Sequence, residues 1–128
     1  MKLIIAGGRD YQLTNLDFER LDRLDAKYLI TEVVSGKARG ADAGGEDWAD
    51  SKGIPLKGFP ADWDKHRRPG STSNKGNPAG VIRNAEMAKY VGKEGGVVLF
   101  PGGRGTQNMY ENAVKYGLKI FDWRNPEE

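Results

Sequence analysis

The sequence predicts an α/β fold: a Rossmann-like, mainly parallel five-stranded sheet with helices on both faces, in a single domain covering residues 1–128. Short apolar runs alternate with segments of helical spacing, which is typical of parallel sheets joined by right-handed crossovers. Glycine-rich turns follow three of the first four apolar runs, where the carboxyl ends of the strands would lie. Ligands bind at that edge in folds of this kind, so the same observations indicate where a site is expected.

Apolar runs and turn signals locate the elements in order. The expected strands are residues 2–6, 31–35, 54–59, 97–100 and 118–123. The expected helices run over about residues 14–29, 42–52, 81–91 and 106–116. Thr14 is a suitable N-cap for the first helix, with Asp17 as its partner in a capping box, and leucines at helical spacing give that helix one apolar face. Gly53 and Gly117 are expected to end the second and fourth helices.

Residues 60–80 break this alternation. Proline and glycine punctuate the stretch, and a polar run, STSN, lies in its middle. Loops of this length are uncommon inside compact domains and are usually functional or disordered. Basic side chains are concentrated here, namely Lys65, His66, Arg67, Arg68 and Lys75. Composition slightly favours a solvated surface loop, and the alternative is a mobile lid over an anionic ligand.

Composition excludes several kinds of site. The chain has no cysteine and one histidine, which excludes disulfides, cysteine nucleophiles and multi-histidine metal sites, and we expect no metal and no cofactor. No apolar run approaches the roughly 20 residues of a membrane helix, and the N-terminus lacks the features of a signal peptide. With a mean hydropathy of -0.67, we expect a cytoplasmic protein without membrane association. A net charge of +2 argues against nucleic acid as a partner.

The stretch VVLFPGGRGTQNM, residues 97–109, carries the strongest functional signal. Pro101 ends its apolar run, because proline lacks the N–H that a strand ladder needs. The turn that follows consists of Gly102, Gly103, Arg104, Gly105 and Thr106. Its glycines would let the backbone approach a phosphate closely, and the first N–H groups of the next helix would face the same anion. The alternative is a tight turn that needs glycine only for its backbone angles.

Two further glycine-rich turns follow the first two expected strands. Their candidate ligand-binding residues are Gly7, Gly8, Arg9 and Asp10 in the first turn and Gly36, Arg39, Gly40 and Asp42 in the second. All three turns belong to one edge of the predicted sheet, so we expect them to converge on one site. Asp10 and Asp42 are candidates to bind a ribose hydroxyl or act as a base, although Asp42 is at least as well explained as the N-cap of the second helix. Trp63 could stack on a base, but partial burial as a loop anchor is the commoner role.

Three segments, VVSGKARGAD, VIRNAEMAKY and VVLFPGGRGT, resemble the SLOG superfamily, and most closely its small single-domain YspA-like branch. The resemblance extends from IIAGGRDY to the last expected strand. It implies a Rossmann-like sheet that binds nucleotides or nucleotide-derived ligands at its glycine-rich turns. It also implies a homo-oligomer, since dimers are common in the superfamily.

The superfamily includes the LOG-type phosphoribohydrolases, whose last turn reads PGGxGTxxE. The glutamate of that motif falls on Met109 in this chain. The resemblance of RNAEM to the preceding LOG helix matches Arg83 to the catalytic arginine of those enzymes, and Asn84 beside it is a candidate ligand-binding residue. Glu86 is the candidate replacement for the missing carboxylate, and an exposed helical residue is the favoured alternative.

Three functions follow from these observations. The first is binding of a nucleotide or nucleotide-derived ligand by a sensor or sequestering protein. The second is LOG-like hydrolysis of the N-glycosidic bond of a nucleoside monophosphate or related nucleotide, which needs a carboxylate near the anomeric carbon. The third, by analogy with the DNA-processing protein DprA, is binding of single-stranded DNA, which needs a basic groove with aromatic side chains.

Overall fold

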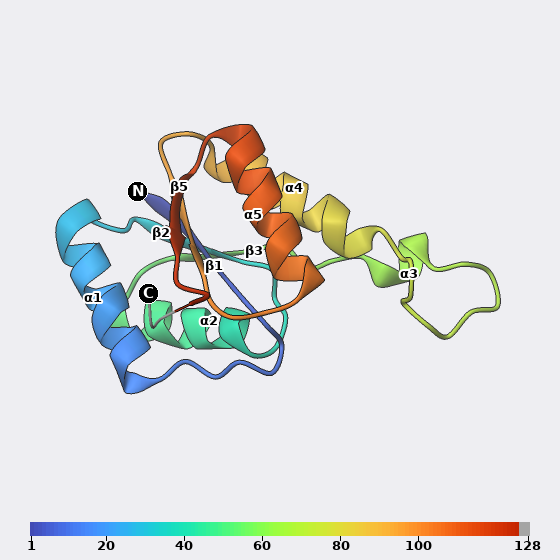
Figure 1. The fold of residues 1–128 in the computed structure, drawn as a ribbon, viewed down its shortest axis with the longest axis horizontal. Coiled ribbons are helices and arrows are strands. Elements are labelled where there is room, and N and C mark those ends of the chain that lie inside the picture. The colour runs from blue at the N-terminus through green and yellow to red at the C-terminus, as the bar shows by residue number, and fades with distance from the viewer. Residues whose placement is uncertain (126–128) are drawn as a thin grey trace.

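The computed structural model describes residues 1–125, and within them it contains one five-stranded sheet whose neighbouring strands are all parallel (Figure 1). The strand order is β3-β2-β1-β4-β5. The strands are β1 (Lys2–Ala6), β2 (Glu32–Ser35), β3 (Leu56–Gly58), β4 (Gly96–Leu99) and β5 (Lys119–Asp122). The predicted α/β class and parallel Rossmann-like sheet are therefore confirmed.

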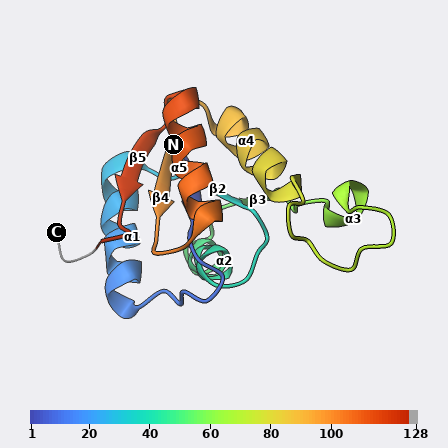
Figure 2. The same ribbon diagram turned by 45° about the vertical axis from the view of Figure 1, so that its right-hand side comes forward.

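Helices cover both faces of this sheet (Figure 2). They are α1 (Asn15–Tyr28), α2 (Ala41–Lys52), α3 (Trp63–His66), α4 (Ala79–Val91) and α5 (Arg104–Tyr116). Leu21 of α1 and Trp48 of α2 pack in one core cluster, and Met87 of α4 and Met109 of α5 pack in the other. Alternate strand residues serve the two clusters, because successive side chains of a strand point to opposite faces. Among residues 1–125, no helix is long and apolar enough to cross a membrane.

The middle of the sheet is formed by β1, which pairs with β2 on one side and β4 on the other. Ile4 lies opposite Val34 in the first pair and Val97 in the second. The chain moves outward from β1 to β3 and then returns, through α4, to place β4 on the other side of β1. Ligands of doubly wound sheets bind beyond the carboxyl ends of the strands at such a reversal, which here lies between β1 and β4.

Two helices begin earlier than the sequence predicts. α5 begins at Arg104 instead of Thr106, and α4 begins at Ala79 instead of residue 81. The preceding N-caps, Gly103 and Pro78, make no side-chain capping bond. Glycine and proline are turn signals in a sequence, but the first helical turn accepts both, because its N–H groups have no acceptor within the helix.

The capping box predicted for the first helix is present. The Asp17 N–H donates to Thr14 Oγ1 over 3.1 Å, and the Thr14 N–H donates to Asp17 Oδ2 over 2.9 Å. The Tyr11 hydroxyl donates to the same carboxylate over 2.6 Å, and burial together with this bond raises the pKa of Tyr11 to about 12. Tyr11 also stacks on Phe100 with ring centroids 5.4 Å apart, which ties the start of α1 to the end of β4.

Residues 60–78, which we call the arm, project from the end of the sheet beside α4 (Figures 1 and 2). The arm contains the four-residue helix α3, so the long loop has secondary structure of its own. Most of the arm is exposed, as the surface-loop interpretation expects.

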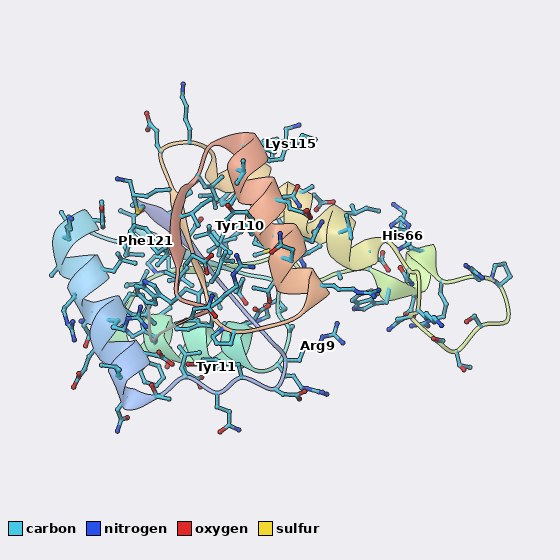
Figure 3. The ribbon with its side chains drawn as sticks, in the orientation of Figure 1. Arg9, Tyr11, His66, Tyr110, Lys115 and Phe121 are labelled. Atoms are coloured by element: carbon cyan, nitrogen blue, oxygen red, sulfur yellow. The ribbon has the colours of Figure 1, made fainter. Side chains whose placement is uncertain are left out.

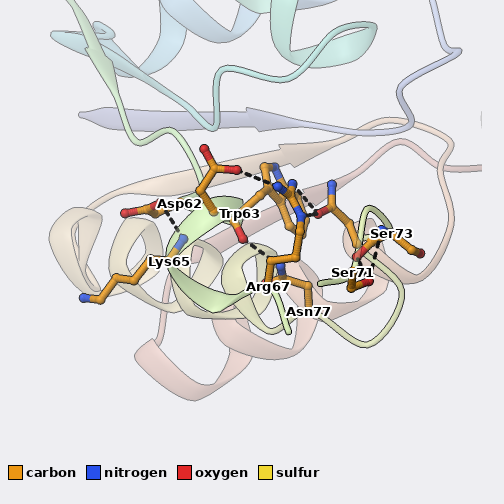
Figure 4. A network of polar contacts seen from close by, with 9 residues as sticks. Asp62, Trp63, Lys65, Arg67, Ser71, Ser73 and Asn77 are labelled. Atoms are coloured by element: carbon orange, nitrogen blue, oxygen red, sulfur yellow. Dashed lines mark hydrogen bonds and ion pairs between the residues drawn. The ribbon is translucent and has the colours of Figure 1, made fainter. Parts of the chain in front are cut away.

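Side-chain hydrogen bonds hold the arm together internally (Figure 4). The Arg67 guanidinium donates to Asp64 over 2.7 Å and to Asn74 over 2.9 Å. The Asn77 amide donates to the Trp63 carbonyl over 2.9 Å, which joins the two ends of the arm. These bonds give a polar segment a defined shape without a hydrophobic core.

We expect Gly7→Ala to lower the free energy of unfolding by about 1–3 kcal/mol, the usual cost of overpacking. An added Cβ at Gly7 would lie 2.7 Å from the Ala41 Cβ and 2.8 Å from the Phe100 Cβ, both on packed segments. Gly105→Ala is the matched control, since its Cβ would meet nothing within 4 Å. Urea unfolding measures both variants, and an equal loss of stability in the two would contradict the packing derived for Gly7.

Candidate functional site

A cavity of about 470 Å³ opens at the carboxyl edge of the sheet, beside the reversal between β1 and β4. All three glycine-rich turns contribute to its walls, together with the first turns of α4 and α5. The predicted site residues that line it are Gly7, Gly8, Arg9, Gly36, Asp42, Arg83, Asn84, Gly103, Arg104, Gly105 and Thr106. We call this cavity the main cavity. The turns therefore meet in space, as their positions on one sheet edge imply.

The N-terminus of α5 forms one wall of the main cavity. The first intrahelical bond runs from the Gln107 N–H to the Gly103 carbonyl over 3.1 Å. The N–H groups of Arg104, Gly105 and Thr106 precede that bond, so they have no acceptor within the helix. These groups and the helix dipole favour a negatively charged group, and Arg104 adds a cation at the same place.

The three turns are held together by close backbone contacts. The Gly8 N–H donates to the Pro101 carbonyl over 2.8 Å, and the Ala41 N–H donates to the Gly8 carbonyl over 3.1 Å. Gly40 has a φ of +76°, and a side chain there would collide with the backbone of the first turn. At Gly102 a Cβ would meet Thr106 and lie 2.7 Å from the Gly8 nitrogen. Gly40 and Gly102 thus support the walls of the main cavity without lining it.

Arg83 and Asn84, in the first half of α4, connect the second turn to the third. The Arg83 guanidinium donates to the Gly36 carbonyl over 2.5 Å and to Asn84 Oδ1 over 2.9 Å. The Asn84 amide in turn donates to the Gly105 carbonyl over 3.2 Å and to Asn108 Oδ1 over 3.0 Å. Burial lowers the pKa of Arg83 from its ordinary value. This chain of bonds orients one guanidinium and the start of α5 together.

Asp42 is the one carboxylate lining the main cavity in the described part of the chain. It is the second residue of α2, whose N-cap is Gly40, so the interpretation of Asp42 as the N-cap is wrong. Its side chain accepts the Ala38 N–H over 3.3 Å and is 7% exposed. Burial raises the pKa of Asp42 to about 6, although the Ala38 bond and the charge of Arg83 partly oppose this effect.

Trp63 of the arm lines the main cavity. The Arg9 guanidinium lies over its ring, 5.6 Å from the centroid. A Cβ at Gly80 would come within 3.1 Å of the ring, so this glycine makes room for the indole at the start of α4. Figure 3 shows Arg9 between the sheet and the arm, near the first turn of α5 in that view. Trp63 is both an anchor of the arm and part of the cavity wall.

The remaining candidates lie elsewhere. Asp10, Arg39 and Gly40 line a different depression, in which the Arg39 guanidinium lies 3.3 Å from the Asp10 carboxylate. Glu86 is exposed on α4 and does not line the main cavity. Met109, at the position of the LOG glutamate, is 2% exposed and presents a thioether side chain to the cavity.

Several lining residues are not predicted from the sequence. They are Ala6, Ala38, Gly80, Val81, Met87 and Asn108. Asn108 carries no local signal, because its role comes from a hydrogen bond with Asn84 on a different helix. Gly80 and Val81 belong to the first turn of α4, and proximity to Pro78 was the available sign that a helix begins there. Among residues 1–125, His, Asp and Glu side chains form no group of three that could hold a metal ion.

The raised pKa of Asp42 predicts a specific pH dependence of stability. Its folded-state pKa of about 6 lies above the ordinary value of 3.8 for an aspartate, so between pH 3.8 and about 6 the folded protein binds a proton that the unfolded chain has lost. The contribution of protonated Asp42 to the free energy of unfolding is fully present below pH 3.8 and is lost as the pH rises through about 6. Ionised Asp42 therefore lowers the free energy of unfolding by about 3 kcal/mol at neutral pH.

We therefore expect Asp42→Asn, which keeps an acceptor for the Ala38 N–H, to be more stable than the wild type at pH 7. The two proteins should differ little at pH 3.5, where the wild-type side chain is protonated in both states. Urea unfolding at half-unit pH intervals gives the difference curve. A difference that stays constant across this range would contradict the raised pKa.

Comparison with known families identifies the chain. The model of the YspA, cpYpsA-related SLOG family matches residues 1–66, which include the first two glycine-rich turns and Asp42. Comparison with curated proteins and with solved structures gave no significant match. The match covers just over half of the sequence, and the parallel sheet agrees with the fold that the resemblance implies. The chain therefore belongs to the YspA, cpYpsA-related SLOG family.

Proposed function

We propose that this protein binds a nucleotide or nucleotide-derived ligand in the main cavity, as a sensor or a sequestering protein. The observation that carries the proposal is the convergence of three glycine-rich turns on one cavity of about 470 Å³. That volume lies within the usual range of small-molecule sites. Membership of a SLOG family suggests the same class of ligand.

The main cavity has residues suited to each part of a nucleotide, namely phosphate, ribose and base. A phosphate fits the free N–H groups at the start of α5, where Arg104 adds a charge-assisted hydrogen bond. Arg83, held by the Gly36 carbonyl and Asn84, can donate to a second phosphate oxygen or to a ribose oxygen. Asp42 can accept from a ribose hydroxyl, and the Trp63 ring offers a face for a base.

Arg104→Gln tests the phosphate position. The side chain is exposed and its loss should leave the fold intact, while affinity for a phosphorylated ligand falls about tenfold with one charge-assisted bond. The full-length protein is titrated calorimetrically with AMP, ADP-ribose, NAD and ribose 5-phosphate after a thermal-shift screen. A ligand at ~100 times its dissociation constant stabilises a fold by about 2.7 kcal/mol, which is readily seen in the screen.

Lys115→Gln is the control for Arg104→Gln. It removes the same charge from an exposed position at the other end of α5, away from the main cavity (Figure 3). Binding by none of these compounds would overturn the proposed function. Equal affinities in the two variants would overturn the placement of the phosphate at α5.

A second function, hydrolysis of the N-glycosidic bond of the bound nucleotide, is favoured by the position of Asp42. A buried carboxyl group with a pKa of about 6 holds its proton in part of the population near neutral pH. We propose that this proton passes to the departing base while water adds to the anomeric carbon and returns a proton to the Asp42 carboxylate, with Arg83 donating to the ribose or its phosphate. Asp42 thus supplies from α2 the carboxylate that Met109 does not supply from α5.

Chromatography of each bound nucleotide after prolonged incubation tests this second function. From a nucleoside 5′-monophosphate we expect free base and ribose 5-phosphate, at a rate that falls as the pH rises above about 6, because the protonated form of Asp42 acts. Asp42→Asn should slow release at least ~100-fold, the usual contribution of a general acid, whereas Glu86→Gln should not. Recovery of intact nucleotide from the wild type would leave binding as the function.

A further inference from the structure

A second depression, of about 370 Å³, adjoins the main cavity and shares Trp63 with it. The two share Arg9, Gly36, Ala38, Trp63 and Arg83 as lining residues. They therefore form one continuous groove, with the Arg9–Trp63 contact along its middle. We call the second depression the side cavity.

Positive charge dominates the side cavity. Lys37 and Arg39 line it without lining the main cavity, and the shared Arg9 and Arg83 complete the set. None of the residues that line it is acidic. Bringing several cations together is unfavourable unless negative charge compensates them, and the carboxylates paired with Lys37 and Arg39, Glu46 and Asp10, lie outside the lining.

The cations of the side cavity are available to a ligand. The Arg39 guanidinium has one carboxylate partner among residues 1–125, Asp10, and both side chains are largely exposed, at 73% and 94%. An exposed pair of this kind contributes little, so Arg39 can exchange its partner at small cost. Arg9 has no ion pair in the described part of the chain, and its contact is the Trp63 ring.

Lys37 is held in place by the backbone. Its φ of +61° is unusual for a residue with a side chain, and the chain extends across Gly58, where an added Cβ would lie 2.8 Å from the Lys37 Cδ. The ammonium group lies 2.8 Å from a carboxylate oxygen of Glu46 and stays 42% exposed. The turn after β2 thus places Lys37 in the lining of the side cavity, with its ammonium group beside Glu46.

The two charged ends of the groove have no residue in common. Arg104 and the free N–H groups of α5 line only the main cavity, while Lys37 and Arg39 line only the side cavity. The two linked phosphates of a diphosphate would both lie at one end of the groove. Phosphates on two separate positions of a sugar can occupy both ends of the groove. The shared middle, with Arg83 and Trp63, and the adjoining Asp42 of the main cavity suit the sugar and base between them.

We infer that the ligand is a small nucleotide with two phosphate groups on separate positions of its sugar, one held at the start of α5 and the other by Lys37 and Arg39. This inference rests on the proposed function and adds the class of ligand to it. It assigns the side cavity as a second phosphate site.

Calorimetric titration with matched pairs of ligands tests the inference. Each common ribonucleoside 5′-monophosphate is compared with its 3′,5′-bisphosphate and its 5′-diphosphate, which has the same number of phosphates in adjacent positions. For at least one base, we expect the bisphosphate to bind about tenfold more tightly than the monophosphate, and the diphosphate to gain much less. Arg39→Gln and Lys37→Gln should each reduce the bisphosphate-to-monophosphate affinity ratio about fivefold, and Lys115→Gln should leave it unchanged.

The outcomes separate the inference from the proposed function. If no nucleotide binds, both are overturned. If monophosphates bind but the bisphosphate has no advantage, or the diphosphate matches it, the ligand class is wrong and nucleotide binding stands. If the advantage survives in both Arg39→Gln and Lys37→Gln, the second phosphate lies elsewhere and the side cavity is not its site. Arg39 is largely exposed, so Arg39→Gln remains informative even if Lys37→Gln destabilises the turn.

Discussion

Close backbone packing between the first and third glycine-rich turns is the constraint on which the site depends. The bond from the Gly8 N–H to the Pro101 carbonyl, 2.8 Å long, joins the ends of β1 and β4, the two strands that flank the reversal in the sheet. Side chains at Gly7 or Gly102 would separate these segments. A crevice at a sheet reversal is a general feature of the fold, but its width here is set by glycine.

That packing brings buried charge into the main cavity. Asp42 and Arg83 come from opposite sides of the sheet, on α2 and α4, and each moderates the effect of burial on the other's pKa. Arg83 is also held by a carbonyl and an amide, so its donors are oriented before any ligand arrives. An anionic ligand near Asp42 would disfavour its ionised form, so ligand charge and the protonation of Asp42 are coupled.

The arm contributes to the groove through one aromatic side chain. Its internal hydrogen bonds, such as those of Arg67 and Asn77, keep it folded away from the core, while Trp63 returns to the sheet edge beside Arg9. The indole lines both the main cavity and the side cavity. The segment that composition predicts as a solvated surface loop thus also contributes one side chain to the cavity wall.

The sequence by itself determined the fold class and the edge at which the site forms. Apolar runs that alternate with segments of helical spacing specify a parallel sheet, because each run is buried as one strand. The capping box of Thr14 and Asp17 specifies a helix start through bonds that are local in the chain. The glycine-rich turns could be assigned to one edge because they follow strands of a parallel sheet, whose carboxyl ends lie at the same edge. Most of the residues of these turns line the main cavity.

Only the tertiary structure decided which polar side chains meet. Asp10 and Asp42 both follow a glycine-rich turn, but one is exposed beside Arg39 and the other is buried in the main cavity. Glu86 and Met87 are adjacent in the sequence, and the orientation of α4 places the first in solvent and the second in the cavity wall. Burial, and with it the pKa of Asp42, depends on elements far apart in the chain, because desolvation is produced by whatever packs around a group and not by its neighbours in sequence.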